Sequence, residues 1–169
     1  MYRKFLPDYY YDTISDITPE FLLSLGIKAL VMDIDNTIVT YDDPIPTPAA
    51  QEWFDGMAAA GIKVSFVSNN EWERVKKFNR SLNYPAYAKS GKPFIRDIKK
   101  AMADMGSDRK NTALIGDQVF TDVFAGKRAG LTVFLVKPIK DKLTVFFRFK
   151  RRLEVPVLRA YQKKKGGFD

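Results

Sequence analysis

Two aspartates one residue apart, Asp33 and Asp35, are the residues of this chain whose types and spacing most clearly suggest chemistry. They follow the stretch from Ala29 to Met32, which is short and fully apolar and is therefore typical of a buried strand. Side chains alternate along a strand, so the two carboxylates would face the same side and repel each other. A protein keeps such a pair when a cation neutralises it or when its protons are used, although a solvated turn would use the same residues.

The composition excludes many of the reactions that such a pair could otherwise assist. The 169 residues include neither cysteine nor histidine. The absence of cysteine excludes disulfides and thiolate metal sites. The absence of histidine excludes imidazole metal sites, Ser-His-Asp and Cys-His nucleophiles, and phosphohistidine chemistry. Any catalysis must depend on carboxylates, lysine, arginine, hydroxyl groups and an ion bound by oxygen ligands.

Polar residues follow three further apolar stretches in the same way. They are Ser68 and Asn69 after residues 62–67, Lys92 after residues 84–88, and Asp117 and Asp122 after residues 112–115. Ligands of parallel α/β sheets bind at the carboxyl ends of the strands, so these side chains are expected to meet the aspartate pair. Four coincidences of this kind, matched in residue type, are difficult to explain as ordinary solvent-exposed residues.

Together these residues have the chemistry of a phosphate site. Asp33 and Asp117, with a backbone carbonyl and waters, can hold Mg²⁺, which prefers oxygen ligands. The ion would screen the approach of a phosphate to a carboxylate nucleophile, which can take the phosphoryl group as an aspartyl-phosphate. Asp35 can give a proton to the leaving oxygen and then take one from water. Ser68 and Lys92 can bind the phosphoryl oxygens.

Alternating strands and helices are expected to position these residues. Strands are predicted at residues 29–34, 62–67, 84–88, 112–115 and 131–136. Helices are predicted at residues 18–26, 47–60, 71–82, 93–105 and 121–130. This alternation favours parallel pairing with right-handed crossovers, which gives a doubly wound, Rossmann-like α/β sheet of five strands.

The chain is expected to form one domain over residues 1–169. Residues 1–26 would be an aromatic-rich lead-in draped over the domain, because free arms are rarely so aromatic. Residues 27–136 would be the catalytic core, and residues 137–169 a basic C-terminal helix and tail. The formal charge of +8 lies entirely in that tail, because basic and acidic residues balance in the rest of the chain.

The motifs resemble those of a known superfamily. The stretch from Asp33 to Thr37 resembles the D-x-D-x-T motif of the haloacid dehalogenase (HAD) superfamily of phosphatases. Ser68, Lys92 and the Gly116-Asp117…Asp122 segment resemble the second, third and fourth motifs of that superfamily, in the correct order. The sequences Asp-Ile-Asp-Asn-Thr, Val-Ser-Asn-Asn and Gly-Asp-Gln-Val-Phe-Thr-Asp are further similar to the YqeG family of subfamily IIIA. These small bacterial phosphatases are similar to the mitochondrial phosphatidylglycerophosphate phosphatases.

The resemblance implies a role for each motif residue. Asp33 would be the nucleophile and Asp35 the general acid and base. The residues implied to hold Mg²⁺ are Asp33, Asp35 through its carbonyl, Asp117 and, in support, Asp122. Those implied to bind or orient the phosphate are Thr37, Ser68, Asn69 and Lys92. Purely structural alternatives exist, because Asp122 can cap a helix, Ser68 and Asn69 can form a turn, and Lys92 can be a solvated loop lysine.

The spacing between the motifs bears on the substrate. HAD phosphatases often carry a cap domain after the first motif or between the second and third. Here only about 30 residues separate Asp35 from Ser68, and even fewer separate Asn70 from Lys92, so neither gap can hold one. We expect an open site, which suits a lipid headgroup at a membrane, a phosphoprotein or a nucleic-acid end. The resemblance favours phosphatidylglycerophosphate.

The basic tail is compatible with several partners. Residues 143–153 combine phenylalanines with arginines and lysines, which is typical of an interfacial helix on an anionic membrane. Basic residues also suit RNA phosphates, so a catalytically minor module that binds RNA is the alternative function. A helix packed on the sheet with a solvated basic face would have the same pattern. A receiver-type phosphoacceptor domain fits the spacing of Asp33 and Asp35 poorly.

No stretch is apolar over enough residues to form a transmembrane helix or a signal peptide. The sequence therefore predicts a cytoplasmic protein, with peripheral membrane contact as the specific expectation for its tail.

Overall fold

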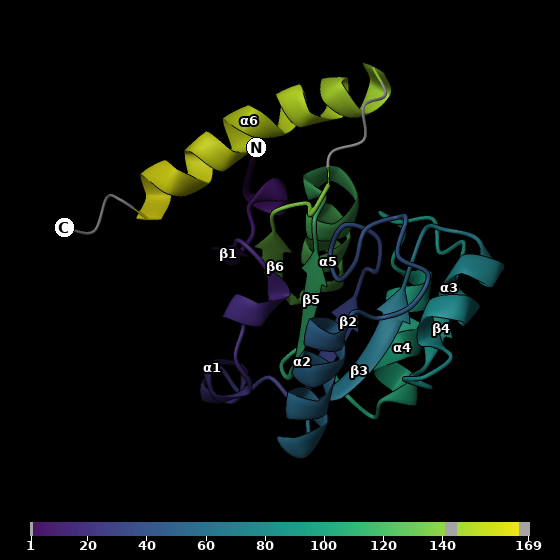
Figure 1. The fold of residues 1–169 in the computed structure, drawn as a ribbon. Helices are drawn as coiled ribbons and strands as arrows, with labels where there is room; N and C mark the ends of the chain where they lie inside the picture. The colour runs from purple at the N-terminus through teal and green to yellow at the C-terminus, as the bar shows by residue number, and fades with distance from the viewer. Residues whose placement is uncertain (1, 141–144, 166–169) are drawn as a thin grey trace.

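The sheet that positions the candidate site is parallel throughout. In this computed structural model, which describes residues 2–140 and 145–165, its six strands have the order β1-β6-β5-β2-β3-β4. They are β1 (Tyr9–Tyr11), β2 (Ala29–Met32), β3 (Lys63–Val67), β4 (Ala86–Tyr87), β5 (Thr112–Gly116) and β6 (Thr132–Val136). β2 lies between β3 and β5, so the strand order reverses beside it (Figure 1). Ligands of such sheets bind at this position.

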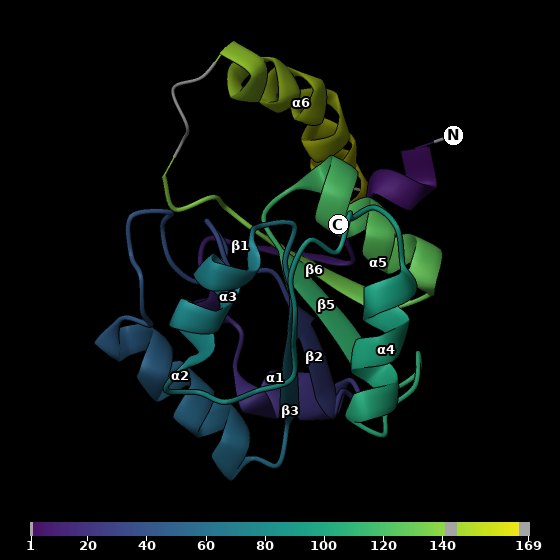
Figure 2. The ribbon, with the colours of Figure 1, turned by 90° about the vertical axis from the view of Figure 1, so that its right-hand side faces the viewer.

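Helices cover both faces of the sheet (Figure 2). The α-helices are α1 (Pro19–Ser24), α2 (Pro48–Ala59), α3 (Trp72–Asn79), α4 (Arg96–Asp104), α5 (Phe124–Ala129) and α6 (Val145–Lys165). Three short turns complete the set: η1 (Tyr2–Phe5), η2 (Ile14–Asp16) and the π-helical η3 (Val119–Val123). Buried side chains of α1, α2 and α3 pack on one face, and those of α4, α5 and α6 belong to the core on the other.

The doubly wound α/β class is confirmed, but the predicted number of strands is wrong. Tyr9–Tyr11 forms a sixth strand at the edge of the sheet, where Tyr9 lies opposite Phe134 and Tyr11 opposite Val136. The predicted lead-in is thus partly built into the sheet rather than draped over it. Three polar-tipped aromatic residues are too short a run to show the pattern of a strand. Only pairing with β6 makes this segment extended.

Several predicted helix boundaries also differ from the structure. The helix predicted to run to residue 82 ends at Asn79, whose side chain donates to the Tyr84 carbonyl and accepts from the Tyr84 N–H. The helix predicted at residues 121–130 begins two residues earlier, as the π-helical turn η3. The start of α2 is confirmed, because Thr47 Oγ1 accepts the Ala50 N–H at 3.2 Å.

The C-terminal helix α6 crosses the domain above the carboxyl ends of the strands (Figure 1). On the helix itself, Glu154, Val157 and Tyr161 are buried, whereas Phe149 and Leu153 are exposed. The helix is therefore attached by one face, as expected for the packed alternative, and presents the other to solvent. Residues 143 and 144 of the predicted interfacial segment lie outside the described residues.

No helix within the described ranges combines the length and the apolarity that crossing a membrane requires. The connections between residues 33 and 95, all of them described, contain α2, α3 and β3–β4 but no additional domain. The predicted absence of a cap is therefore confirmed.

Candidate active site

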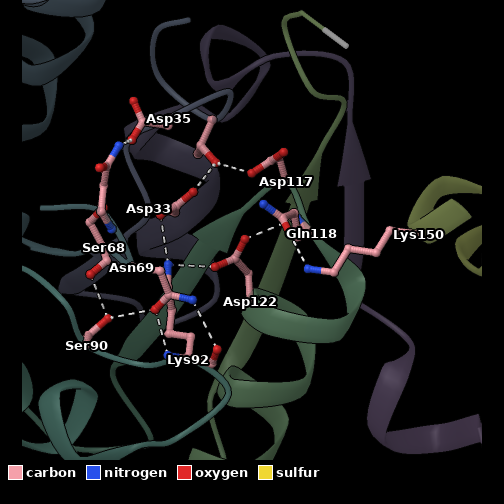
Figure 3. Close-up of polar contacts among 12 residues, drawn as sticks. Asp33, Asp35, Ser68, Asn69, Ser90, Lys92, Asp117, Gln118, Asp122 and Lys150 are labelled. Atoms are coloured by element: carbon pink, nitrogen blue, oxygen red, sulfur yellow. Dashed lines mark hydrogen bonds and ion pairs between the residues drawn. The ribbon is translucent and has the colours of Figure 1, made fainter. Parts of the chain in front are cut away.

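The carboxyl ends of the strands bring the predicted residues together in one buried cluster (Figure 3). Asp33, Asp35 and Thr37 follow β2, and the others follow β3, β4 and β5; of the predicted residues, only Asn69 is exposed. Seven of the predicted residues are less than a tenth exposed: Asp33, Asp35, Thr37, Ser68, Lys92, Asp117 and Asp122. Polar groups are buried only when they have partners, so their contacts describe what the site is built to hold.

Lys92 joins two of the carboxylates. Its Nζ lies 2.8 Å from Asp33 Oδ1 and 2.7 Å from Asp122 Oδ1, and its side chain is only 3% exposed. Thr37 Oγ1 lies 3.2 Å from Asp117 Oδ1 and 3.4 Å from Asp33 Oδ2, which links the ends of β2 and β5. Lys92 and Thr37 together therefore contact all three carboxylates.

Burial and charge act against each other in this cluster. Burial raises the pKa of Asp33 to about 6, with help from the charge of Asp122, although the Lys92 ammonium opposes the shift. Burial alone would lower the pKa of Lys92, but the charges of Asp122 and Asp33 outweigh it and the pKa is raised. Lys92 is therefore a permanent cation, and one positive charge faces three carboxyl groups.

The cluster fits the divalent cation that the sequence predicts. Asp33, Asp117 and Asp122 each offer a carboxylate oxygen, and these oxygens lie within 4.8 Å of one another. Mg²⁺ takes oxygen ligands of this kind, and a second cation would balance the charge that Lys92 leaves. The carboxylate of Asp35 is not part of this group, which is compatible with a ligand role for its backbone carbonyl only.

The Asp35 carboxylate instead has its own set of donors. Its Oδ1 accepts from Arg74 Nη2 at 2.8 Å and from Arg74 Nε at 3.0 Å. Its Oδ2 accepts from Asn70 Nδ2 at 2.8 Å. Arg74 Nη2 also lies 3.2 Å from the Thr40 carbonyl, which ties α3 to the loop after β2. The direction of the Asp35 side chain is thus set by Asn70 and Arg74.

Ser68 and Asn69 are both part of the turn that leaves β3. Ser68 Oγ accepts the Asn70 N–H at 3.1 Å. The Asn69 amide donates to the Lys92 carbonyl at 3.0 Å and accepts the Lys92 N–H at 2.7 Å. Ser90 Oγ donates to the Ser68 carbonyl at 2.9 Å, which ties the two loops together again. Asn69 therefore holds the backbone beside Lys92, and its amide is already occupied by that loop.

Four residues contribute to the site without a role predicted from the sequence. Three of them, Tyr41, Ser90 and Arg74, were not singled out at all, and Asn70 was noted only as part of the Val-Ser-Asn-Asn stretch. Tyr41 is half-buried, and burial together with the charges of Asp117 and Asp33 raises its pKa. Asn70 belongs to the Val-Ser-Asn-Asn stretch that leaves β3, and Arg74 lies in the first turn of α3.

The fourth motif requires a close approach between two backbone segments. Asp122 lies in the turn η3, and its Oδ2 accepts the Gln118 N–H at 3.1 Å. A Cβ added to Gly116 would overlap the Cβ and Cγ of Asp122. Glycine at this position therefore allows Asp122 to reach Lys92.

Gly116→Ala is expected to disrupt this arrangement. The overlap must displace Asp122 or the end of β5, so we expect a loss of about 2 kcal/mol in the free energy of unfolding, as for other overpacked sites. Urea denaturation measures it. Gly56→Ala is the matched control, because its Cβ meets nothing within 4 Å and alanine favours the interior of α2. A Gly116→Ala protein as stable as the Gly56→Ala protein would contradict the packing argument.

Comparisons with known proteins identify the family. A family model described as HAD-hydrolase-like matches residues 89–140. The chain is 39% identical over 162 residues to the Bacillus subtilis (strain 168) protein named Probable phosphatase YqeG, covering 96% of this chain and 94% of that protein.

Solved structures share the fold. A subfamily III A HAD hydrolase from Legionella pneumophila has a TM-score of 0.53 at 18% identity, over 89% of this chain and 93% of its own. The cobalt-bound deoxy-D-mannose-octulosonate 8-phosphate phosphatase of Haemophilus influenzae has a TM-score of 0.55 at 15% identity, over 82% of this chain and 91% of its own. With the site at the switch point of the sheet and the identity to YqeG over nearly the whole chain, this protein belongs to the YqeG family of HAD-superfamily phosphatases, which are phosphoric monoester hydrolases.

Proposed function

We propose that this protein is a Mg²⁺-dependent phosphatase that forms an aspartyl-phosphate on Asp33. The observation that carries the proposal is the buried cluster in which Asp33 lies beside Lys92. A single cation could contact carboxylate oxygens of Asp33, Asp117 and Asp122 at once. When bound there, Mg²⁺ would neutralise charge on the carboxylates and on the phosphate.

The residues of the chain can divide the reaction between them. A carboxylate oxygen of Asp33 attacks phosphorus, and the bond from phosphorus to the ester oxygen breaks. Asp35 gives its proton to that leaving oxygen and later accepts one from the water that attacks the aspartyl-phosphate. Inorganic phosphate then leaves, and Asp33 is regenerated. Lys92, whose ammonium group lies beside Asp33, and the buried Ser68 would hold the phosphoryl oxygens throughout.

Arg74 acts as a positioning residue for Asp35 in this scheme. Both oxygens of Asp35 accept hydrogen bonds in the structure, from Arg74 and from Asn70. Asp35 must exchange one of these bonds for a proton before it can act as an acid. The remaining bonds then keep the carboxyl group directed at the same place.

Arg74→Ala is expected to lower kcat for an alkyl phosphate by about tenfold, a part of what general acid catalysis usually contributes. The loss should be smaller for 4-nitrophenyl phosphate, because its leaving group departs without help from an acid. KM should change little for either ester. Arg80→Ala, an exposed arginine of the same region, is the matched control. Equal losses for the two esters would show that Arg74 does not act through proton transfer.

We propose phosphatidylglycerophosphate, or another phosphate on a bulky or membrane-bound molecule, as the preferred substrate. The resemblance to phosphatidylglycerophosphate phosphatases and the lack of a cap domain over the site support it. The basic face of α6 supports peripheral contact with an anionic membrane.

The proposal is tested by a substrate screen in the presence of Mg²⁺, with EDTA as the matched condition. The screen compares phospholipid phosphomonoesters with sugar phosphates, nucleotides and phosphopeptides. Preferential turnover of the lipid, lost in EDTA, is the expected result. Equal turnover of many soluble esters with none of the lipid would overturn the substrate, and undiminished turnover in EDTA would overturn the metal requirement.

A further inference from the structure

Exposed apolar side chains recur at the end of the sheet that carries the candidate site. The connection that follows each of four strands, counted to the first residue of the next helix, carries one large apolar residue that is at least half exposed. These rim residues are Ile45 after β2 (58%), Trp72 after β3 (58%), Phe94 after β4 (68%) and Ile139 after β6 (50%). The first three of these connections also supply Asp33, Ser68 and Lys92. Apolar residues exposed singly are ordinary, but a set gathered at one end of the sheet marks an interaction surface.

Hydrogen bonds join the segments that carry the rim residues. The bonds are Ile139 N to the Asn36 carbonyl (3.2 Å), Arg74 Nη2 to the Thr40 carbonyl (3.2 Å), Lys89 N to the Asn70 carbonyl (2.9 Å) and Asn69 Nδ2 to the Lys92 carbonyl (3.0 Å). The segments that carry the four apolar residues are therefore held together beside the site.

Helix α6 extends this surface with positive charge. It lies above the same end of the sheet in both views (Figures 1 and 2), where Glu154 accepts the Val119 N–H at 3.0 Å. On its exposed side, Phe149 and Leu153 accompany basic residues. The exposed basic side chains of α6 are Arg148, Arg152, Arg159, Lys163 and Lys164. An apolar and cationic surface is thus held next to the fourth motif.

We infer that the rim and the exposed side of α6 together dock on an anionic lipid bilayer, with the active site facing it. Tryptophan and phenylalanine favour the membrane interface, and arginine and lysine favour anionic headgroups. The isoleucines and Leu153 decide between a bilayer and a nucleic acid, because aliphatic side chains gain from hydrocarbon and offer nothing to a phosphate backbone. This inference rests on the proposed function and specifies how a lipid phosphate would reach Asp33.

Tryptophan fluorescence gives a local readout of docking. The chain contains two tryptophans, and the other, Trp53, donates to the Ile17 carbonyl at 2.9 Å. In a Trp53→Phe protein, the emission of Trp72 is expected to shift to shorter wavelength when phosphatidylglycerol-containing vesicles are added, and brominated lipid should quench it. Phosphatidylcholine vesicles should have a much smaller effect. Unchanged Trp72 emission with the anionic vesicles would overturn the proposed orientation.

Vesicle sedimentation of the full chain supplies the matched comparison. A protein with both Trp72→Ser and Phe94→Ser should bind anionic vesicles at least about tenfold more weakly, since two large apolar side chains no longer leave water. Leu23→Ser is the control, because Leu23 is 44% exposed on α1, before the amino end of β2. Equal weakening by both changes would overturn the inference, as would binding to single-stranded RNA or an acidic protein but not to vesicles.

Hydrolysis of soluble 4-nitrophenyl phosphate separates this inference from the proposed function. All of these variants should retain it, because none of the changed residues touches the carboxylate cluster. A protein that binds vesicles through the rim but never hydrolyses a phosphate ester would refute the proposed function and leave the docking surface standing. A protein that hydrolyses soluble esters but does not bind vesicles would refute the docking surface and leave the proposed function standing.

Discussion

Asp33→Asn should lower the phosphatase activity at least about a thousandfold, which is the order of loss seen when a catalytic nucleophile is replaced. A carboxamide has nearly the same shape as a carboxylate but does not attack phosphorus. The protein should remain folded, because Lys92 keeps its ion pair with Asp122 at 2.7 Å and the cluster loses one of its three mutually repelling charges.

The measurement is kcat/KM toward 4-nitrophenyl phosphate with saturating Mg²⁺, with circular dichroism to confirm the fold. Asp55→Asn is the matched control. It makes the same chemical change at an exposed residue of α2, away from the site. An Asp33→Asn protein that is folded and retains a substantial share of the activity would show that another residue is the nucleophile.

The elements that carry the site were predictable because their signals are local. The run from Ala29 to Met32 is buried on both faces of a parallel sheet, so it is apolar at every position and easily recognised. Thr47 and Pro48 start α2 through a cap that depends on neighbouring residues alone. From such strands and helices, the meeting of polar residues at the carboxyl ends follows from topology.

The features that were missed depend on distant parts of the chain. The tyrosines of β1 become a strand only because β6 offers a free edge, more than a hundred residues later in the sequence. The turn η3 begins at Val119, whose N–H is held by Glu154 from α6. Local patterns contain no information about such partners, so the sequence placed Asp122 in a helix but not in a π-helical turn.

The candidate site shows the same division between residues and their partners. Residue types and order were sufficient to choose Asp33, Asp35 and Lys92. They did not reveal that Arg74 and Asn70 direct Asp35, because these contacts join residues at least 35 positions apart, which only the folded chain brings together. The catalytic roles themselves remain predictions that depend on the experiments above.

Lys92→Met should destabilise the protein by about 3 kcal/mol at neutral pH without Mg²⁺, the usual result of removing one partner from a buried ion pair. Methionine fills the same space but leaves the carboxyl groups of Asp33 and Asp122, which lie beside that of Asp117, without their ion-pair partner. The loss should depend on pH. Lys92 lowers the pKa of Asp33, which nevertheless stands at about 6, so its removal raises that pKa further above the ordinary value of 3.8.

The folded variant therefore binds more protons than the unfolded chain between about pH 4 and the raised pKa, and its stability falls as pH rises through that window. Urea denaturation should accordingly show a smaller deficit near pH 5 than near pH 8. Added Mg²⁺ should restore part of the lost stability at the higher pH, because it supplies the missing positive charge.

Lys89→Met is the control, since Lys89 pairs with Glu71 on the surface, where such a pair contributes less than about 1 kcal/mol. A Lys92→Met protein whose stability matches that of Lys89→Met at every pH would mean that the three carboxyl groups do not repel one another in the folded state, and the proposed cation site would lose its physical basis.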